Sequence, residues 1–166
     1  MIVTVWSALR SMARHPFRFV LSRWNWKAGL VSAVMRGTIF FLTALGGGLA
    51  IALRALLVDV AFRVPLSGLC AAVIQEVRWA EPAWAAITVS LGVVPLAAHA
   101  IEIAVHWFAR TPWLWRGVGA SIALSILSSA VELFLMRHQI LLVGPEGASL
   151  GSDFRRLLHI FGSRSA

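Results

Sequence analysis

Histidine and glutamate recur along one stretch of the chain that is otherwise apolar. Within residues 83–108, His99, Glu102 and His106 are separated by three and four positions, so on a helix they would share one face. Histidine and carboxylate side chains are common steps of intramembrane proton relays. The same groups can ligate zinc, manganese or iron. The stripe therefore suggests proton transfer or metal binding, although its spacing matches no established metal-binding signature.

A second set of charged residues lies in the preceding apolar stretch. Asp59 and Arg63 are four positions apart, so they would form a pair on one helix face. Counting back from the polar segment at 76–82, at about 1.5 Å per residue, brings Arg63 level with about residue 97 and Asp59 level with Glu102. The sequence therefore predicts one polar cluster inside the apolar helices, formed by Asp59, Arg63, His99, Glu102, His106 and Arg54.

This cluster has three interpretations. An isolated charge in the bilayer costs at least ~2.5–3.5 kcal/mol, so a paired network that fixes helix packing is the simplest explanation. A proton or ion path would use the histidines and carboxylates as titratable steps. A metal, haem or pigment site would use His99, Glu102 and His106, but such sites in bundles repeat a Glu-x-x-His motif on a second helix. The last apolar stretch offers Glu132 without that histidine, so we expect no cofactor.

Small and hydroxyl residues form a matching stripe on the last apolar stretch. Small side chains let membrane helices approach closely, and hydroxyl groups hydrogen-bond between them. The stripe should therefore pack against the helix that carries His99. Glu132 ends the stripe, five residues before Arg137. Glu132 is therefore either a further relay or ligand group or an acid that reaches the membrane surface. The residues predicted to pack are Gly117, Ser121, Ser125 and Ser129.

Four apolar helices must position these residues. The chain has 166 residues, of which 59% are hydrophobic and 13% charged, and a soluble fold needs more polar surface than that. About 20 apolar residues suffice to cross a bilayer. We therefore predict an all-α, polytopic four-helix transmembrane bundle over residues 28–138, with spans at about 28–45, 49–75, 83–108 and 117–136. A rival first span at 37–53 would remove Arg36 and Arg54 from the lipid but leaves no turn before the next apolar run.

Residues 1–27 are basic and contain no acidic residue. Arg10, Arg14 and Arg18 recur every four positions, on a different helical face from the apolar residues. This pattern predicts an amphipathic helix at the membrane interface. Trp24, Trp26 and Lys27 should anchor it at headgroup level. The expected partner is a bilayer with anionic headgroups, not nucleic acid, because no soluble module remains to carry a basic face.

Residues 139–166 should form a short tail with one amphipathic helix. Ser152 is its predicted N-cap and Asp153 lies in its first turn. Leu157, Leu158 and Phe161 form the predicted apolar face. Four spans place both termini on one side, and their arginines mark that side as cytoplasmic. The strong preference for arginine over lysine is typical of a GC-rich bacterial genome, which predicts a multi-pass protein of the inner membrane.

Function follows from this organisation only in outline. The sequence contains no nucleophile elbow, phosphate loop, HExxH or CxxC motif, and its lone Cys70 excludes an intramolecular disulfide. The expected role is therefore a non-enzymatic accessory, assembly or structural subunit that associates with other membrane subunits or with itself. The alternative is a small homo-oligomeric transporter or proton or ion conductor that uses the His/Glu/Arg cluster. A metal-, haem- or pigment-binding membrane protein is the third interpretation.

Overall fold

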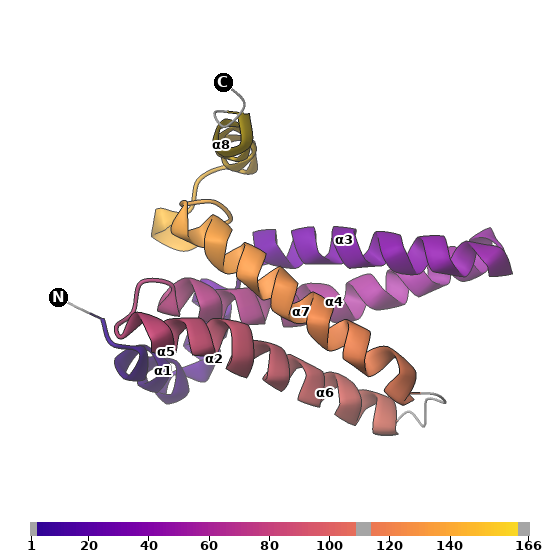
Figure 1. Cartoon of the computed structure of the whole chain (residues 1–166), viewed down its shortest axis with the longest axis horizontal. Helices are drawn as coiled ribbons and strands as arrows, with labels where there is room; N and C mark the ends of the chain where they lie inside the picture. The colour runs from indigo at the N-terminus through magenta and orange to yellow at the C-terminus, as the bar shows by residue number, and fades with distance from the viewer. Residues whose placement is uncertain (1–2, 109–113, 163–166) are drawn as a thin grey trace.

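The computed structural model describes residues 3–108 and 114–162, and within these ranges the chain forms helices and no β-strand. The all-α prediction is therefore confirmed. Figure 1 shows two long hairpins, one made of α3 and α4 and the other of α5, α6 and α7. The helices are α1 (Val5–Arg14), α2 (Pro16–Arg23), α3 (Trp26–Ala44), α4 (Leu49–Val77), α5 (Ala83–Thr88), α6 (Val94–Phe108), α7 (Leu114–Arg137) and α8 (Leu150–Gly162).

The turn between α3 and α4 shows where the first long helix ends. The 3-10 turn η1 (Leu45–Gly47) ends α3, and Gly48 follows with φ +101°. Glycine adopts that left-handed backbone without the steric cost that a side chain would add. A single helix over 37–53 is therefore wrong, and the glycine run closes a hairpin.

Small residues allow α3 and α4 to pack closely. A Cβ added to Gly29 would lie 2.8 Å from the Val64 carbonyl oxygen of α4, so only glycine fits this crossing. Further along, the hydroxyl groups of Ser32 and Ser67 are 3.0 Å apart and hydrogen-bonded. Gly68 makes room for the Trp24 indole, whose Nε1 donates to the Pro65 carbonyl oxygen at 3.3 Å. Pro65 lies inside a continuous α4.

A π-helical turn, η2 (Val89–Val93), joins α5 to α6 within one helical rod over residues 83–108. The Val94 N–H donates to the Val89 carbonyl, five residues back. Pro95 follows directly and has no N–H for the ordinary helical bond. A widened turn accommodates such a proline, and turns of this kind are frequent at functional sites.

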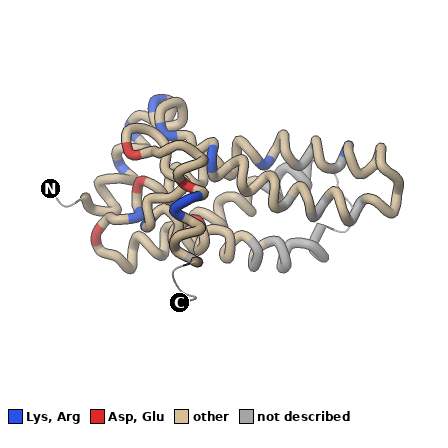
Figure 2. Tube along the Cα trace, turned by 90° about the horizontal axis from the view of Figure 1, so that it is seen from above, with Lys and Arg blue, Asp and Glu red and all other residues tan. Residues whose placement is uncertain are grey.

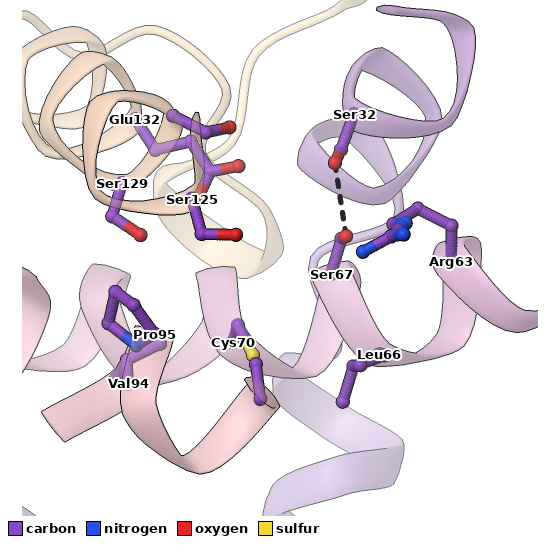
Figure 3. A pocket seen from close by; sticks show the side chains of 12 residues that line it. Ser32, Arg63, Leu66, Ser67, Cys70, Val94, Pro95, Ser125, Ser129 and Glu132 are labelled. Atoms are coloured by element: carbon purple, nitrogen blue, oxygen red, sulfur yellow. Dashed lines mark hydrogen bonds between the residues drawn. The ribbon is translucent and has the colours of Figure 1, made fainter. Parts of the chain in front are cut away.

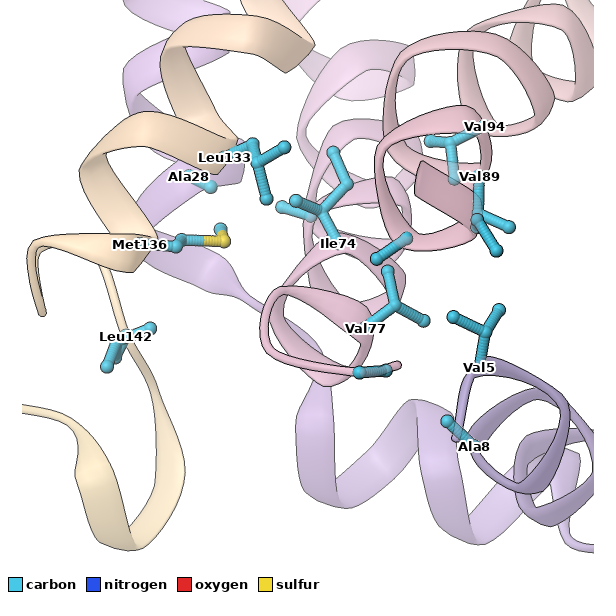
Figure 4. Packing of buried hydrophobic residues seen from close by; sticks show 14 residues of the cluster. Val5, Ala8, Ala28, Ile74, Val77, Val89, Val94, Leu133, Met136 and Leu142 are labelled. Carbon is cyan, nitrogen blue, oxygen red and sulfur yellow. The ribbon is translucent and has the colours of Figure 1, made fainter. Parts of the chain in front are cut away.

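The chain segments outside the long helices lie together at one end of the bundle. The segment before α1 lies beside the 78–82 connection, where Val5 N–H donates to the Glu81 carbonyl at 2.9 Å. Figure 4 shows the apolar cluster that joins α1, α4, α7 and the chain after α7, with Val5, Val77, Met136 and Leu142 among its members. We call this end the junction. Figure 2 shows that most charged positions gather there.

The last helix, α8, runs across the bundle rather than along it. Figure 1 shows α8 nearly end-on beside the junction, and Figure 2 shows it crossing the long axis. Among the described residues, two helical segments are long and apolar enough to cross a membrane, Val60–Val77 of α4 and Ala83–Ile101 of the α5–α6 rod.

Candidate functional site

A small polar cavity lies where α3, α4, α6 and α7 meet. Its volume is about 40 Å³. Arg63 of α4 enters it with only 7% of its surface exposed. Figure 3 shows Arg63 and Glu132 pointing into this space from opposite sides. The cavity is lined by Ser32, Arg63, Leu66, Ser67, Cys70, Val94, Pro95, Ala98, Ser125, Ser128, Ser129 and Glu132.

Hydroxyl groups dominate the polar lining of this cavity. Ser125, Ser128 and Ser129 come from α7 and face Val94 and Pro95 of α6 across the space. Ser129 is 8% exposed, and Ser125 is half-buried. These serines therefore lie at the meeting of α7 with α4 and α6.

Glu132 belongs to this cavity. It is half-buried, although its position five residues before Arg137 also allowed a place at the surface. Arg63 and Glu132 both have interaction partners within the fold. Opposite charges that line one cavity can offset part of each other's desolvation cost. The structure thus brings Arg63 together with an acid that the predicted cluster did not include.

An apolar crevice separates α3 from α7 next to the polar cavity. Its volume is about 170 Å³. Ser32, Ser128 and Glu132 line both hollows, so the two adjoin. The remaining wall is formed by Ala28, Val31, Met35, Leu127, Val131, Leu135 and Leu141.

The other residues of the predicted cluster differ in where they lie. His99 is 4% exposed and has an interaction partner, yet it does not line the polar cavity. Arg54 is exposed on α4. The side chains of Asp59, Glu102 and His106 lie outside the described part of the structure, as do those of Gly117 and Ser121.

A metal site is not visible in the described part of the chain. Within it, no three His, Cys, Asp or Glu side chains come close enough together to hold an ion. The triad of His99, Glu102 and His106 is not tested by this, because two of its members lie outside the described side chains.

The junction contains a buried amide network that sequence reasoning missed. Asn25 and Gln75 are 0% and 2% exposed, and the Asn25 Nδ2 donates to the Gln75 Oε1 at 3.0 Å. The Asn25 Nδ2 also donates to the Leu141 carbonyl at 2.7 Å. Gln75 binds the backbone of Val143 twice, since its Nε2 donates to the carbonyl at 3.0 Å and its Oε1 accepts from the N–H at 3.1 Å. The chain after α7 is thus bound to the start of α3 and the end of α4.

A buried ion pair completes the junction and corrects the expected role of Lys27. The Lys27 Nζ lies 2.7 Å from the Asp153 Oδ2, and the two side chains are 3% and 4% exposed. The same Nζ donates to the Ala148 carbonyl. Lys27 as a headgroup anchor was therefore wrong, because its charge is committed to the tail helix. Trp24 and Trp26 remain exposed at 36% and 44%.

Two further arginines bind the segments that meet at the junction. Arg78 pairs with Glu146 and donates to the Gln75 carbonyl. The Arg137 Nε donates to the Arg78 carbonyl at 3.1 Å, and its guanidinium lies over the Trp79 ring at 5.6 Å. The end of α7 is thereby fixed to the 78–82 connection.

The tail helix begins earlier than the sequence predicted. Ser149, not Ser152, precedes α8, and its Oγ accepts from the Ser152 N–H at 3.2 Å. The exposed apolar residues are Leu150, Phe154 and Leu158 at 41%, 60% and 57%. They recur every four residues and so form one exposed stripe, while Asp153 is buried against Lys27. The side chain of Phe161 lies outside the described part of the structure.

Comparison of the chain with protein-family models, with curated proteins and with solved structures finds no match among them.

Proposed function

We propose that this chain is a multi-pass membrane protein of four spans that serves as a non-enzymatic accessory or assembly subunit. Its long helices support the spanning arrangement. Those of 19 and 24 residues, α3 and α7, would extend about 28 and 36 Å at 1.5 Å per residue, against about 30 Å of hydrocarbon. The junction would lie in the cytoplasm with both termini, because their arginines favour that side.

The exposed position of Arg54 is the observation that supports the subunit role. Its side chain is exposed on α4 between the exposed apolar residues Leu53 and Leu57. It forms no ion pair with any side chain that the structure describes. An arginine among lipid-facing leucines gains from a carboxylate supplied by a neighbouring membrane protein or a second copy of the chain. The distal part of the α3–α4 hairpin is therefore the proposed subunit interface.

The small polar cavity argues against a carrier that binds an organic substrate beside Arg63. Drug-sized ligands occupy pockets of about 300–1,000 Å³, and the cavity around Arg63 holds about 40 Å³. Protein association at the outside of the bundle requires no such interior space.

Native mass measurement in mild detergent tests the proposal. The wild-type chain should migrate as a complex, with itself or with a co-purified membrane protein. Arg54→Leu should shift it to the monomer mass, because the ion pair at the interface is lost. Arg155→Leu is the matched control, since Arg155 is an exposed arginine on α8, away from the hairpin. A wild-type monomer, or a complex unchanged by Arg54→Leu, would contradict the proposal.

Proton or ion conduction is the second candidate. The presence of Arg63 and Glu132 in the lining of one cavity favours it. A cavity of about 40 Å³ has room for water, which needs about 10–15 Å³ of such volume. Serine hydroxyls on its wall could complete a proton path. Purified protein in vesicles should then dissipate a pH gradient, and Glu132→Gln should abolish this. A gradient that wild-type protein leaves intact would remove this candidate.

A further inference from the structure

The tail helix α8 exposes an apolar stripe. It is formed by Leu150, Phe154 and Leu158, which are 41%, 60% and 57% exposed. We propose that this stripe lies in the headgroup region of the cytoplasmic leaflet and that α8 binds anionic lipid there. This inference rests on the proposed membrane location. It does not depend on the subunit role, because Arg54 belongs to α4 and not to the tail helix.

A contact with α3 sets the level of α8 along the bundle. The Asp153 Oδ2 lies 2.7 Å from the Lys27 Nζ, and Lys27 is the second residue of α3. In the proposed membrane location, the start of α3 lies at the cytoplasmic headgroups. The exposed Trp24 and Trp26 belong to the same level, and indole rings favour the headgroup region. The ion pair therefore holds α8 at the membrane surface.

The direction of α8 suits a helix that lies along that surface. It crosses the long axis of the bundle (Figures 1 and 2). A bilayer that the long helices cross would therefore run along α8. Helices that lie in the interface bury an apolar face among the lipids and keep a basic, polar face in water.

A hydrogen bond on the other side of α8 shows which way the stripe faces. The Arg156 Nη1 donates to the Gln139 carbonyl at 2.6 Å, and Gln139 lies just beyond the end of α7 at Arg137. At about 100° per residue, Arg156 and Phe154 lie on opposite sides of the helix. Arg156 is thus directed to the cytoplasmic end of the bundle. The stripe is directed to the side on which the long helices enter the bilayer.

The exposed charges of α8 select the kind of lipid. Its acidic residue, Asp153, is buried in the pair with Lys27. Its basic residues, Arg155, Arg156 and His159, are exposed. The negative surface of the cytoplasmic leaflet attracts basic residues that lie beside it. Anionic lipid therefore complements both the apolar stripe and the charges next to it.

Spin-label accessibility tests this placement in the full chain. Phe154→Cys and His159→Cys are made separately in a Cys70→Ala background, labelled, and placed in nanodiscs of phosphatidylcholine and phosphatidylglycerol. The label at 154 should be several-fold more accessible to oxygen, which concentrates in lipid, than to a water-soluble nickel chelate. The label at 159 should show the reverse, because His159 is exposed on the face away from the stripe.

A third label, at Leu57→Cys, separates this inference from the membrane location, because Leu57 is 67% exposed on α4. A label in lipid at 57 and in water at 154 would overturn the inference alone. A label in water at 57 would contradict the membrane location and the inference with it. A label at 154 that neither reagent reaches would mean that protein covers the stripe, which would also overturn the inference.

The lipid charge is tested with the same label at 154. Its oxygen-to-nickel accessibility ratio should be higher in discs with phosphatidylglycerol than in discs of phosphatidylcholine alone. Arg155→Glu should abolish this difference, because it replaces attraction by repulsion. Arg14→Glu is the matched control, since Arg14 is an exposed arginine on α1, and it should leave the difference intact. Equal ratios in the two kinds of disc before any arginine is changed would overturn the assignment of anionic lipid.

Discussion

The junction and the opposite half of the bundle solve the problem of buried polarity in different ways. At the junction, Asn25, Gln75, Lys27 and Asp153 are almost fully buried and hydrogen-bonded to one another or to backbone. Away from it, the helices enclose a polar cavity and an adjoining apolar crevice, and Arg54 is exposed. Satisfied polar groups fix one arrangement of segments. The comparison therefore assigns the fixing of distant segments to the junction, whereas the other half keeps internal space and an exposed charge.

Breaking the buried ion pair should have the largest effect. Asp153→Ala leaves the Lys27 ammonium buried without its carboxylate, which should destabilise the fold by about 3–5 kcal/mol. Equilibrium unfolding in detergent measures the loss, and limited proteolysis should show α8 released first. The double variant Lys27→Met/Asp153→Leu should recover most of the stability, because replacing both charges with apolar groups is often neutral. A wild-type unfolding curve for Asp153→Ala would show that the pair does not hold the junction.

Removal of the Gln75 amide should have the next largest effect. Gln75→Leu leaves the Asn25 Nδ2 with one acceptor and both backbone groups of Val143 without their partner. Each buried polar group left unsatisfied costs about 1–3 kcal/mol. Gln139→Leu is the control, because Gln139 is exposed. The same unfolding measurement should separate the two variants, and equal curves would exclude the network as a stabilising feature.

A smaller effect is expected at the crossing of α3 and α4, which extends from the junction into the opposite half. Gly29→Ala would place a methyl group 2.8 Å from the Val64 carbonyl oxygen, and overpacking of this kind costs about 1–3 kcal/mol. Gly92→Ala is the matched control, because nothing lies within 4 Å of its added Cβ. If both variants unfold alike, the two helices do not depend on close approach at Gly29.

The sequence predicted the helices well and the contacts between distant segments poorly. Apolar runs bounded by glycines, prolines and charges placed α3 and α4 within two residues of their observed bounds. Depth counting brought Arg63 to the level of residue 97, and in the structure Arg63 lines the same cavity as Pro95 and Ala98. Helical rise is uniform, so such counting works along a helix.

Counting along a helix could not reveal which residues of the tail return to the bundle. Lys27 and Asp153 are 126 positions apart, and Asn25 meets the backbone of Leu141. Nothing in local composition distinguishes a buried lysine from one that reaches the lipid surface. An acidic residue at the start of an amphipathic tail helix was the one available signal, and it also suits an interaction with the helix dipole.

The placement of Glu132 illustrates a second limit. Its distance from Arg137 along the helix allowed a surface position, because long side chains reach the interface. Its half-buried position instead depends on how α7 packs with α3, α4 and α6 around the cavity, which is a property of tertiary packing. Pro95 could have signalled the widened turn η2, since its missing N–H was visible in the sequence.

The central claim is that four helices cross the bilayer. The most direct test is to measure from which side of the membrane a reagent reaches each end of the bundle. Single cysteines are placed at Gly46 in the α3–α4 turn and at Ser11, Glu81 and Gly151 around the junction, all in a Cys70→Ala background. An impermeant maleimide applied to intact cells should label only the cysteine at 46. Those at 11, 81 and 151 should react only after the membrane is opened. Labelling of position 46 from the same side as the junction positions would contradict a hairpin that crosses the bilayer, and with it the four-span account.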